Sequence, residues 1–474
     1  MKQKHHSTPV GSKTTIHDVI SWGAELRSLH ARIAPYFARP EPRHRCLLYL
    51  QGILSDVARK NGWQLAEQAG ESRPDGMQRL LTTAVWDENG VRDELRSYVL
   101  AHLKDPYAVV AIDETSFPKR GNQSAGVAHQ YCGSTKQVEN CQVGVFLSYL
   151  SSRGHTLLDR ELYLPRHWLA DRARCEKAGI PDTVVFQTKC ELARAMMERV
   201  HQAQIPVAWV VADTVYGNNL DLRTWLEDHQ YWFALAVAST EPIGVMTAQG
   251  RTLLTVAQAE QRFVNEEEWQ RFSVKTGTKG PLLFEWACLP ILHRWEDDGQ
   301  HWLLIRRIPT HPPDKTYYLV FGPAGTSLEV MAWAVGSRWG IEEEFENAKD
   351  LGLDQYEVRS WVGWFRHVTL VLLVLAVLTV LCAQEQAGTP VSAEEMSHQV
   401  TPAPIPLTVP EVRRLLGRLL FPLPRSAMVV LARELVASRP SGPGTRLARK
   451  TALELELVVR WFVLSAPAHS QVVC

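Results

Sequence analysis

Two short apolar segments, each ending on an aspartate, constrain the fold more than any other feature of the sequence. Residues 107–113 read YAVVAID and residues 206–213 read PVAWVVAD. Runs of this length and composition are typical of buried β-strands. An aspartate at the C-terminal end of a buried strand lies at the rim of the sheet, where ligands bind in open α/β folds. If the two strands are neighbours, Asp113 and Asp213 come close together, and a hard cation with oxygen ligands would remove their repulsion.

The segments around these two strands predict a mixed α/β domain. Three strands, a helix, a strand, a helix and a strand follow one another along the chain. Residues 240–325 contain more short strands, such as HWLLIRRI and TYYLVFG, and are interpreted as a β-rich insertion. A strong helix follows from residue 327 to residue 349. Besides the two strands above, the predicted core strands are 142–150, 156–164 and 231–238, and the predicted core helices are 182–204 and 220–229.

The first hundred residues predict helices, because apolar residues recur there every three or four positions. Residues 63–69 and 76–83 fit either a helix-turn-helix that reads DNA or part of a plain helical bundle. Near the other end, Thr408 and Glu411 fit a capping box that opens a basic helix. The predicted N-terminal helices are 16–37, 43–57, 76–85 and 91–103. The predicted domains are a helical, DNA-binding 1–105, a catalytic domain from 106–239 and 326–386, the insertion 240–325, and a linker with C-terminal helices at 387–474.

Charge and cysteine content bound the function only loosely. The 474 residues carry 51 lysines and arginines against 51 aspartates and glutamates, so the formal net charge is zero. This balance counts mildly against a DNA-binding protein, although local basic clusters can still contact phosphates. The eight cysteines include no CxxC pair, which argues against a structural zinc site and favours free thiols in a reducing compartment. Residues 1–15 are polar and lack the apolar core of a secretory signal.

One apolar run, residues 368–382, is nearly all valine, leucine and alanine. A membrane span needs about 20 such residues, so this shorter run predicts a buried helix packed on the catalytic sheet. Because the run is apolar all round, it needs a second partner, either the N-terminal helices or a helix at residues 412–421.

A third acidic candidate, Glu342, lies in the segment RWGIEEEFE at residues 338–346. Two simpler interpretations remain open at this point. An aspartate at a strand end can simply cap a turn, and an acidic helix can present a solvated face. Against the second interpretation, Trp339, Ile341 and Phe345 are apolar, so part of this helix must pack.

The spacing of Arg338, Glu342 and Lys349 resembles the signature of insertion-sequence transposases with a DDE active site, R-W-x-I-E-x-x-F-x-x-x-K. That signature begins with a tyrosine three positions before the arginine, where this chain has Val335. Other stretches resemble the insertion-sequence 701 family in particular, from about residue 40 to about residue 420. They are RKNGWQLAE (59–67), IDETSFPKRG (112–121), SAGVAHQYCG (124–133), NCQVGV (140–145), LYLPRHW (162–168), ADTVYG (212–217) and GLDQYEVRSWVGWFRHVTL (352–370).

The resemblance implies a ribonuclease-H-like fold in which Asp113, Asp213 and Glu342 hold two Mg²⁺ or Mn²⁺ ions. Such enzymes cleave DNA at the ends of the element and then join the freed 3′-hydroxyl to target DNA, without a covalent protein–DNA bond or ATP. Mg²⁺ suits a site built from a few carboxylates and phosphate oxygens. The candidate DNA-binding residues are Arg338, Lys349, Lys119, Arg120, Arg59 and Lys60.

The implied partners are double-stranded DNA carrying terminal inverted repeats and target DNA, with a homodimer as one form that the synaptic complex could take. The implied location is the bacterial cytoplasm, at the nucleoid and not in a membrane. Tryptophans 269, 286, 295 and 302 could stack on a flipped base or simply pack in the core. The alternative function is a non-catalytic DNA-binding protein descended from a transposase. The acidic triad argues against it, whereas the sequence after residue 440 argues for it, since it lacks the basic, histidine-rich and aromatic tail typical of the family.

Overall fold

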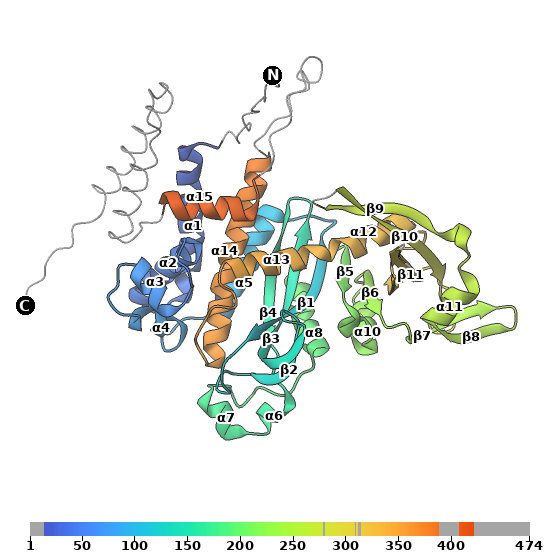
Figure 1. Cartoon of the computed structure of the whole chain (residues 1–474), viewed down its shortest axis with the longest axis horizontal. Coiled ribbons are helices and arrows are strands. Elements are labelled where there is room, and N and C mark those ends of the chain that lie inside the picture. The colour runs from blue at the N-terminus through green and yellow to red at the C-terminus, as the bar shows by residue number, and fades with distance from the viewer. Residues whose placement is uncertain (1–13, 278–279, 309, 311–313, 388–406, 421–474) are drawn as a thin grey trace, which may run out of the picture. The chain divides into compact units, whose positions relative to one another are not determined.

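A computed structural model describes residues 14–277, 280–308, 310, 314–387 and 407–420 (Figure 1). The chain begins with helices, as its periodicity predicts. The capping box of Thr15 and Asp18 opens α1, and Asp87 caps α5. The first helix ends four residues earlier than predicted, and a short 3₁₀ turn containing Pro35 follows it. The N-terminal helices are α1 (Ile16–Ile33), η1 (Ala34–Tyr36), α2 (Pro40–Leu54), α3 (Gly62–Gln68), α4 (Asp75–Leu81) and α5 (Glu88–Leu103).

A mixed sheet of ten strands forms the centre of the described chain. Its order is β2-β3-β1-β5-β6-β12-β11-β10-β9, and β4 also pairs with β3. Only β1–β5 and β5–β6 are parallel, and the other pairs are antiparallel. The strands are β1 (Val109–Pro118), β2 (Ala128–Cys132), β3 (Gln137–Ser151), β4 (Gly154–Leu162), β5 (Trp209–Ala212), β6 (Phe233–Val237), β9 (Gln270–Gly277), β10 (Gly280–Pro290), β11 (His301–Ile308) and β12 (Asp314–Phe321).

The mixed α/β class predicted from the strand and helix order is confirmed, and the sheet is compatible with a ribonuclease-H-like fold. The strand-rich segment 240–325 extends this sheet, because β12 pairs with β6 and carries β11, β10 and β9 beyond it. A separate two-stranded sheet also lies in this segment, formed by β7 (Pro242–Thr247) and β8 (Gly250–Thr255). Trp286 is fully buried there, whereas Trp295 is about half exposed.

Several predicted boundaries are wrong. The strand that carries Asp113 does not end there, because β1 continues to Pro118 in antiparallel pairing with β3. The helix predicted at 327–349 is two helices that meet at Arg338. The helix predicted from residue 182 begins at Lys189, where Thr188 and Glu191 form a capping box. The remaining helices are α6 (Arg166–Leu169), α7 (Arg172–Lys177), α8 (Lys189–Gln202), α9 (Thr214–Gly217), α10 (Leu220–Asp228), α11 (Val256–Phe263), η2 (Glu266–Glu268), α12 (Leu328–Ser337), α13 (Trp339–Asp350), α14 (Trp361–Ala387) and α15 (Val409–Leu420).

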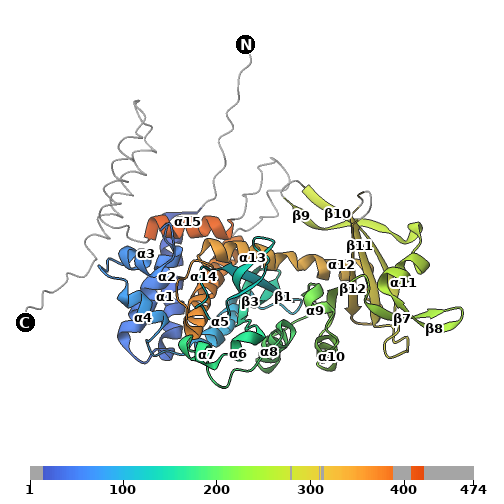
Figure 2. The same cartoon turned by 60° about the horizontal axis from the view of Figure 1, so that its bottom comes forward.

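The apolar run 368–382 lies within α14, which is buried between the sheet and the helical N-terminal region (Figure 2). This helix contacts β4 on one side and α2, α4, α5 and α15 on others, so the predicted core helix and both of its predicted partners are confirmed. By length and composition alone α14 could cross a membrane, but the whole of its apolar stretch is buried within the structure. The predicted capping box of Thr408 and Glu411 is also present, at the start of α15.

The free thiols predicted from the cysteine spacing are confirmed for seven cysteines, because none of those in the described ranges forms a disulfide. The linker predicted from residue 387 and the sequence after residue 420 lie outside the described residues, apart from residues 407–420.

Candidate active site

Asp113 and Asp213 occupy equivalent positions on neighbouring parallel strands. The β1–β5 register ends with Ile112 opposite Ala212, so each aspartate is the next residue on its strand. Adjacent strands lie about 4.8 Å apart, which brings the two carboxylates to one small region of the sheet. The predicted convergence of these two aspartates thus arises from a shared register, although only the β5 strand ends there.

Glu342 is tied to the same region through Arg338. The guanidinium donates from Nη1 to Oδ2 of Asp113 at 2.8 Å and from Nη2 to Oε1 of Glu342 at 2.7 Å. Arg338 therefore joins two different parts of the fold, because Asp113 lies on β1 and Glu342 lies on α13. In this structure Arg338 pairs with both carboxylates and is not free to hold a phosphate.

Burial is the main perturbation of the two aspartates. Burial, together with the smaller effect of the charge on Asp213, raises the pKa of Asp113 to about 7 against the opposing effect of Arg338. Burial also raises the pKa of Asp213, and the neighbouring Glu114 adds to that increase. Carboxyl groups that are buried and repel one another in this way gain from a bound cation.

Glu114, the residue after Asp113, makes contacts that connect β1 to neighbouring helices. Its carboxylate accepts from Lys189 Nζ at 2.5 Å and from the Tyr216 hydroxyl at 2.6 Å. Lys189 opens α8, and Tyr216 lies in the short helix that follows Asp213. This network links β1 to both helices next to β5, so it positions the two aspartates.

The turn after β5 depends on a glycine. Asp213 caps α9, because its Oδ1 accepts from the backbone N–H of Val215 at 2.9 Å, as the turn-capping interpretation predicts. At the end of this helix, a Cβ added to Gly217 would lie 1.8 Å from the carbonyl oxygen of Ala236. The helix can therefore approach β6 only with glycine at this position. The capping role and a ligand role for Asp213 are compatible, since a carboxylate has two oxygens.

The helix that carries Glu342 is packed against the sheet on its apolar side. Ile341, Phe345 and Ala348 are buried, and the rings of Phe345 and Phe146 lie 5.5 Å apart. The next acidic residue, Glu344, is fully buried, and its Oε1 accepts from the hydroxyl of Ser148 on β3 at 2.7 Å. The acidic helix therefore does not have a uniformly solvated acidic face. Its acidic residues differ in environment, because Glu342 lies at the site, Glu344 is buried, and Glu343 and Glu346 are exposed.

Burial raises the pKa of Glu344 to about 8, although His155 and Ser148 act in the opposite direction. A carboxyl whose folded pKa exceeds its unfolded pKa binds its proton more tightly in the native state. Its stabilising contribution is therefore complete at low pH and is lost as the pH rises through about 8. We expect Glu344→Gln to be more stable than the wild type at pH 9, on the order of a few kcal/mol, with this advantage shrinking toward pH 5.

Thermal unfolding at pH 5, 7 and 9 in the presence of a chelator measures this difference. Glu346→Gln is the matched control, because Glu346 lies on the same helix and is exposed. An advantage of the Glu344 variant that is the same at all three pH values would show that the native carboxyl does not titrate in this range.

The basic residues predicted to bind DNA lie in different environments. Lys60 is buried, and its ammonium donates to the carbonyl oxygens of Ser55 and Val57. Lys119 points inward, with its Nζ 3.4 Å from the centre of the Tyr356 ring. Burial lowers the pKa of each of these lysines to about 8. Neither lysine is presented to a nucleic acid here. Arg59 and Arg120 are exposed, and Lys349 is partly exposed.

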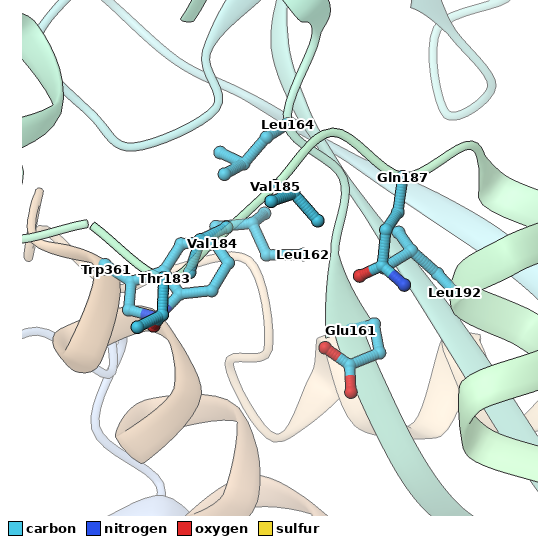
Figure 3. A pocket seen from close by; sticks show the side chains of 9 residues that line it. All are labelled: Glu161, Leu162, Leu164, Thr183, Val184, Val185, Gln187, Leu192 and Trp361. Carbon is cyan, nitrogen blue, oxygen red and sulfur yellow. The ribbon is translucent and has the colours of Figure 1, made fainter. Parts of the chain in front are cut away.

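A separate pocket lies between β4 and the segment that leads into α8 (Figure 3). Leu164 and Val185 form part of its wall, and the Gln187 amide and Glu161 carboxylate face the same space. Glu161 pairs with Arg199 at 2.7 Å. None of the three candidate metal ligands lines this pocket, so it is distinct from the carboxylate site.

The donor set of the carboxylate site fits a divalent metal. Asp113, Asp213 and Glu342 supply oxygen donors, which Mg²⁺ prefers. Arg338 is the only cation paired with these three carboxylates among the described residues, so they have two excess negative charges when fully ionised. A divalent ion matches that excess. The sequence did not indicate Glu114, Tyr216 or Lys189, although the adjacency of Glu114 to Asp113 was a visible signal.

The sequence is similar to known proteins in two respects. Residues 32–243, which include both aspartates but not Glu342, match the family described as DDE superfamily endonuclease. The chain is also 26% identical over 266 residues to a protein of Microchaete diplosiphon named "Probable transposase for insertion sequence element IS701". This alignment spans 55% of the chain and 66% of that relative. The chain is therefore similar to DDE superfamily endonucleases over residues 32–243 and to an insertion-sequence 701 transposase over 55% of its length.

Proposed function

We propose that this chain is a transposase that cleaves DNA at the ends of its element and transfers the freed strand into target DNA. The observation that carries the proposal is the equal register of Asp113 and Asp213 on neighbouring parallel strands, with Glu342 joined to the first through Arg338. The match of residues 32–243 to the DDE superfamily endonuclease family supports an endonuclease. The ribonuclease-H-like architecture belongs to the same proposal.

We propose Asp113, Asp213 and Glu342 as the ligands of two Mg²⁺ or Mn²⁺ ions. Bound there, the ions would polarise the scissile phosphate and stabilise the attacking and leaving oxygens. The protein's own contribution is to hold the carboxylates in place through Glu114 and Tyr216. Arg338 must release at least part of its pairing when a metal enters, after which its guanidinium is available to a backbone phosphate.

The proposed DNA surface includes Lys349, Arg120 and Arg59. Lys349 lies seven residues after Glu342, about two helical turns, and so on the same face of α13. It forms no ion pair within the part of the chain that the structure describes. Its charge is therefore available to a phosphate near the scissile bond. The short helices α3 and α4 are compatible with both interpretations of their sequence, a helix-turn-helix that reads DNA and part of a helical bundle.

Lys349→Ala is expected to weaken binding to cleaved element ends and to reduce the slope of log K against log salt by about one, because one phosphate contact is lost. Fluorescence anisotropy at several salt concentrations measures that slope. Lys177→Ala, an exposed lysine on α7, is the matched control and should leave the slope unchanged. Equal slopes for wild type and Lys349→Ala would remove Lys349 from the DNA surface.

Incubation of the full chain with duplexes carrying the inverted repeats that flank its gene, in Mg²⁺ or Mn²⁺, tests the proposal itself. Nicking at the repeat ends, followed by joining to a target plasmid, is the expected result. Specific binding without cleavage in either metal would favour the alternative, a DNA-binding protein descended from a transposase.

We place the active enzyme in the cytoplasm at the nucleoid, acting on two DNA ends as a homodimer. If cleavage is lost at protein concentrations too low for a dimer to form, the homodimer is supported. Full activity of the monomer would refute it.

A further inference from the structure

A second group of potential metal ligands lies outside the carboxylate site. Glu227, near the end of α10, faces His293, in the turn between β10 and β11, and His301, the first residue of β11. The Nε2 atoms of His293 and His301 lie 3.7 Å and 3.5 Å from the two carboxylate oxygens of Glu227. Ligand atoms around a tetrahedral zinc ion with bonds of about 2.0–2.1 Å are about 3.3 Å apart, so the three side chains need only a small contraction to share one ion.

His301 is buried and oriented in the way expected of a metal-binding histidine. The residue is only 8% exposed, and its buried Nε2 has no hydrogen-bond partner among the described residues. Its other nitrogen, Nδ1, lies 2.8 Å from Oδ2 of Asp298. A carboxylate that accepts from one ring nitrogen of a histidine leaves the lone pair on the other nitrogen, which is the arrangement that orients metal-binding histidines. Here that second nitrogen is directed at Glu227.

The local fold holds both imidazole rings beside Glu227. The rings of His293 and His301 are stacked with centres 4.2 Å apart, and the ring of Phe321 lies on the other side of His301 at 4.8 Å. His293 opens a tight turn closed by a β-bridge to Glu296. The two central residues of this turn, Arg294 and Trp295, both have positive φ, which costs energy for residues other than glycine. The chain thus accepts backbone strain at the position that brings His293 to the cluster.

We propose that Glu227, His293 and His301 bind a Zn²⁺ ion at a structural site separate from the carboxylate triad. Two imidazoles and a carboxylate suit zinc better than Mg²⁺ or Ca²⁺, which prefer all-oxygen sites. Asp298 is engaged by Nδ1 of His301, so a water molecule would complete the four ligands. This proposal does not depend on the proposed transposase activity.

The site would join two parts of the fold that are far apart in sequence. Glu227 lies on the helix that follows Asp213 and α9, whereas both histidines belong to the strand-rich segment 240–325. A zinc ion would therefore fix that segment to α10, which packs against α8 and α9. Cysteine spacing could not reveal such a site, since its ligands are histidines and a glutamate at positions 227, 293 and 301.

The test is metal content of the purified full chain. Protein stripped with a chelator is dialysed against micromolar Zn²⁺ with millimolar Mg²⁺, which keeps the carboxylate site filled, and zinc is measured by mass spectrometry. We expect one zinc per chain, a rise in Tm on zinc addition, and visible absorption of four-coordinate Co²⁺ when cobalt replaces zinc. His293→Gln and Glu227→Gln should bind zinc at least tenfold more weakly and lose the Tm shift. His293 is substituted instead of His301 because it is the more exposed histidine, so its replacement should disturb folding less.

Two matched controls separate this site from others. Asp213→Asn should retain the zinc, because it alters only the carboxylate site. His229→Gln should also retain it, because the His229 ring stacks on Trp225 near the same end of α10 and lies outside the cluster. Absence of zinc from the wild type would overturn the proposal. Loss of zinc in either control but not in His293→Gln would overturn it as well.

Discussion

Asp213→Asn is expected to reduce DNA cleavage by more than about 100-fold while leaving DNA binding nearly intact. Residues behind a metal ligand typically contribute 10–100-fold to metal affinity or activity, so the loss of a charged ligand should exceed that range. Asparagine keeps the size of the side chain and remains a good helix cap, so α9 should keep its contact with the Asp213 position. The substitution therefore removes charge from the site with little change in the fold.

Cleavage of labelled element ends in Mg²⁺, compared with anisotropy of the same DNA, separates the two effects. Asp171→Asn is the matched control, because Asp171 caps α7 in the same way and is exposed. It should cleave at the wild-type rate. Cleavage at the wild-type rate by purified Asp213→Asn would exclude this aspartate as a metal ligand.

The sequence was sufficient to predict the parts of this site that local chemistry determines. An apolar strand followed by an aspartate predicts both Asp113 and Asp213, and the spacing of Arg338 and Glu342 predicts their shared helix face. The end of β1 was mispredicted because β3 continues to pair with it after β5 has ended. That pairing depends on a partner strand about 30 residues away, which local periodicity does not report.

Long-range packing determines the rest, so the sequence could not supply it. Lysine is usually exposed, yet Lys60 and Lys119 are turned inward by contacts with a loop carbonyl and an aromatic ring. Glu344 is one of three consecutive glutamates, and only the packing of α13 on β3 decides that this one is buried. The same holds for the β-rich insertion, which the sequence delimits but which joins the main sheet only through the pairing of β12 with β6.

Gly217→Ala should have the second large effect, this time on both stability and activity. The new Cβ would lie 1.8 Å from the carbonyl oxygen of Ala236 and 3.2 Å from Cβ of Leu235, and both neighbours belong to β6. The first is backbone of a central, buried strand, so it cannot rotate away as a side chain would. The helix α9 must move instead. We expect a loss of about 1–3 kcal/mol or more, as for other overpacked positions.

The movement of α9 would also reach the carboxylates. Asp213 is the cap of this helix, and Tyr216 within it donates to Glu114. Since a misplacement of about 1 Å can cost about 100-fold in rate, cleavage should fall far more than the small added volume suggests. Gly133→Ala is the matched control, because a Cβ there meets nothing within 4 Å, and it should preserve both Tm and cleavage. If Gly217→Ala instead has the Tm and cleavage rate of the wild type, then α9 can leave β6 without disturbing Asp213, and the close contact has no part in positioning the site.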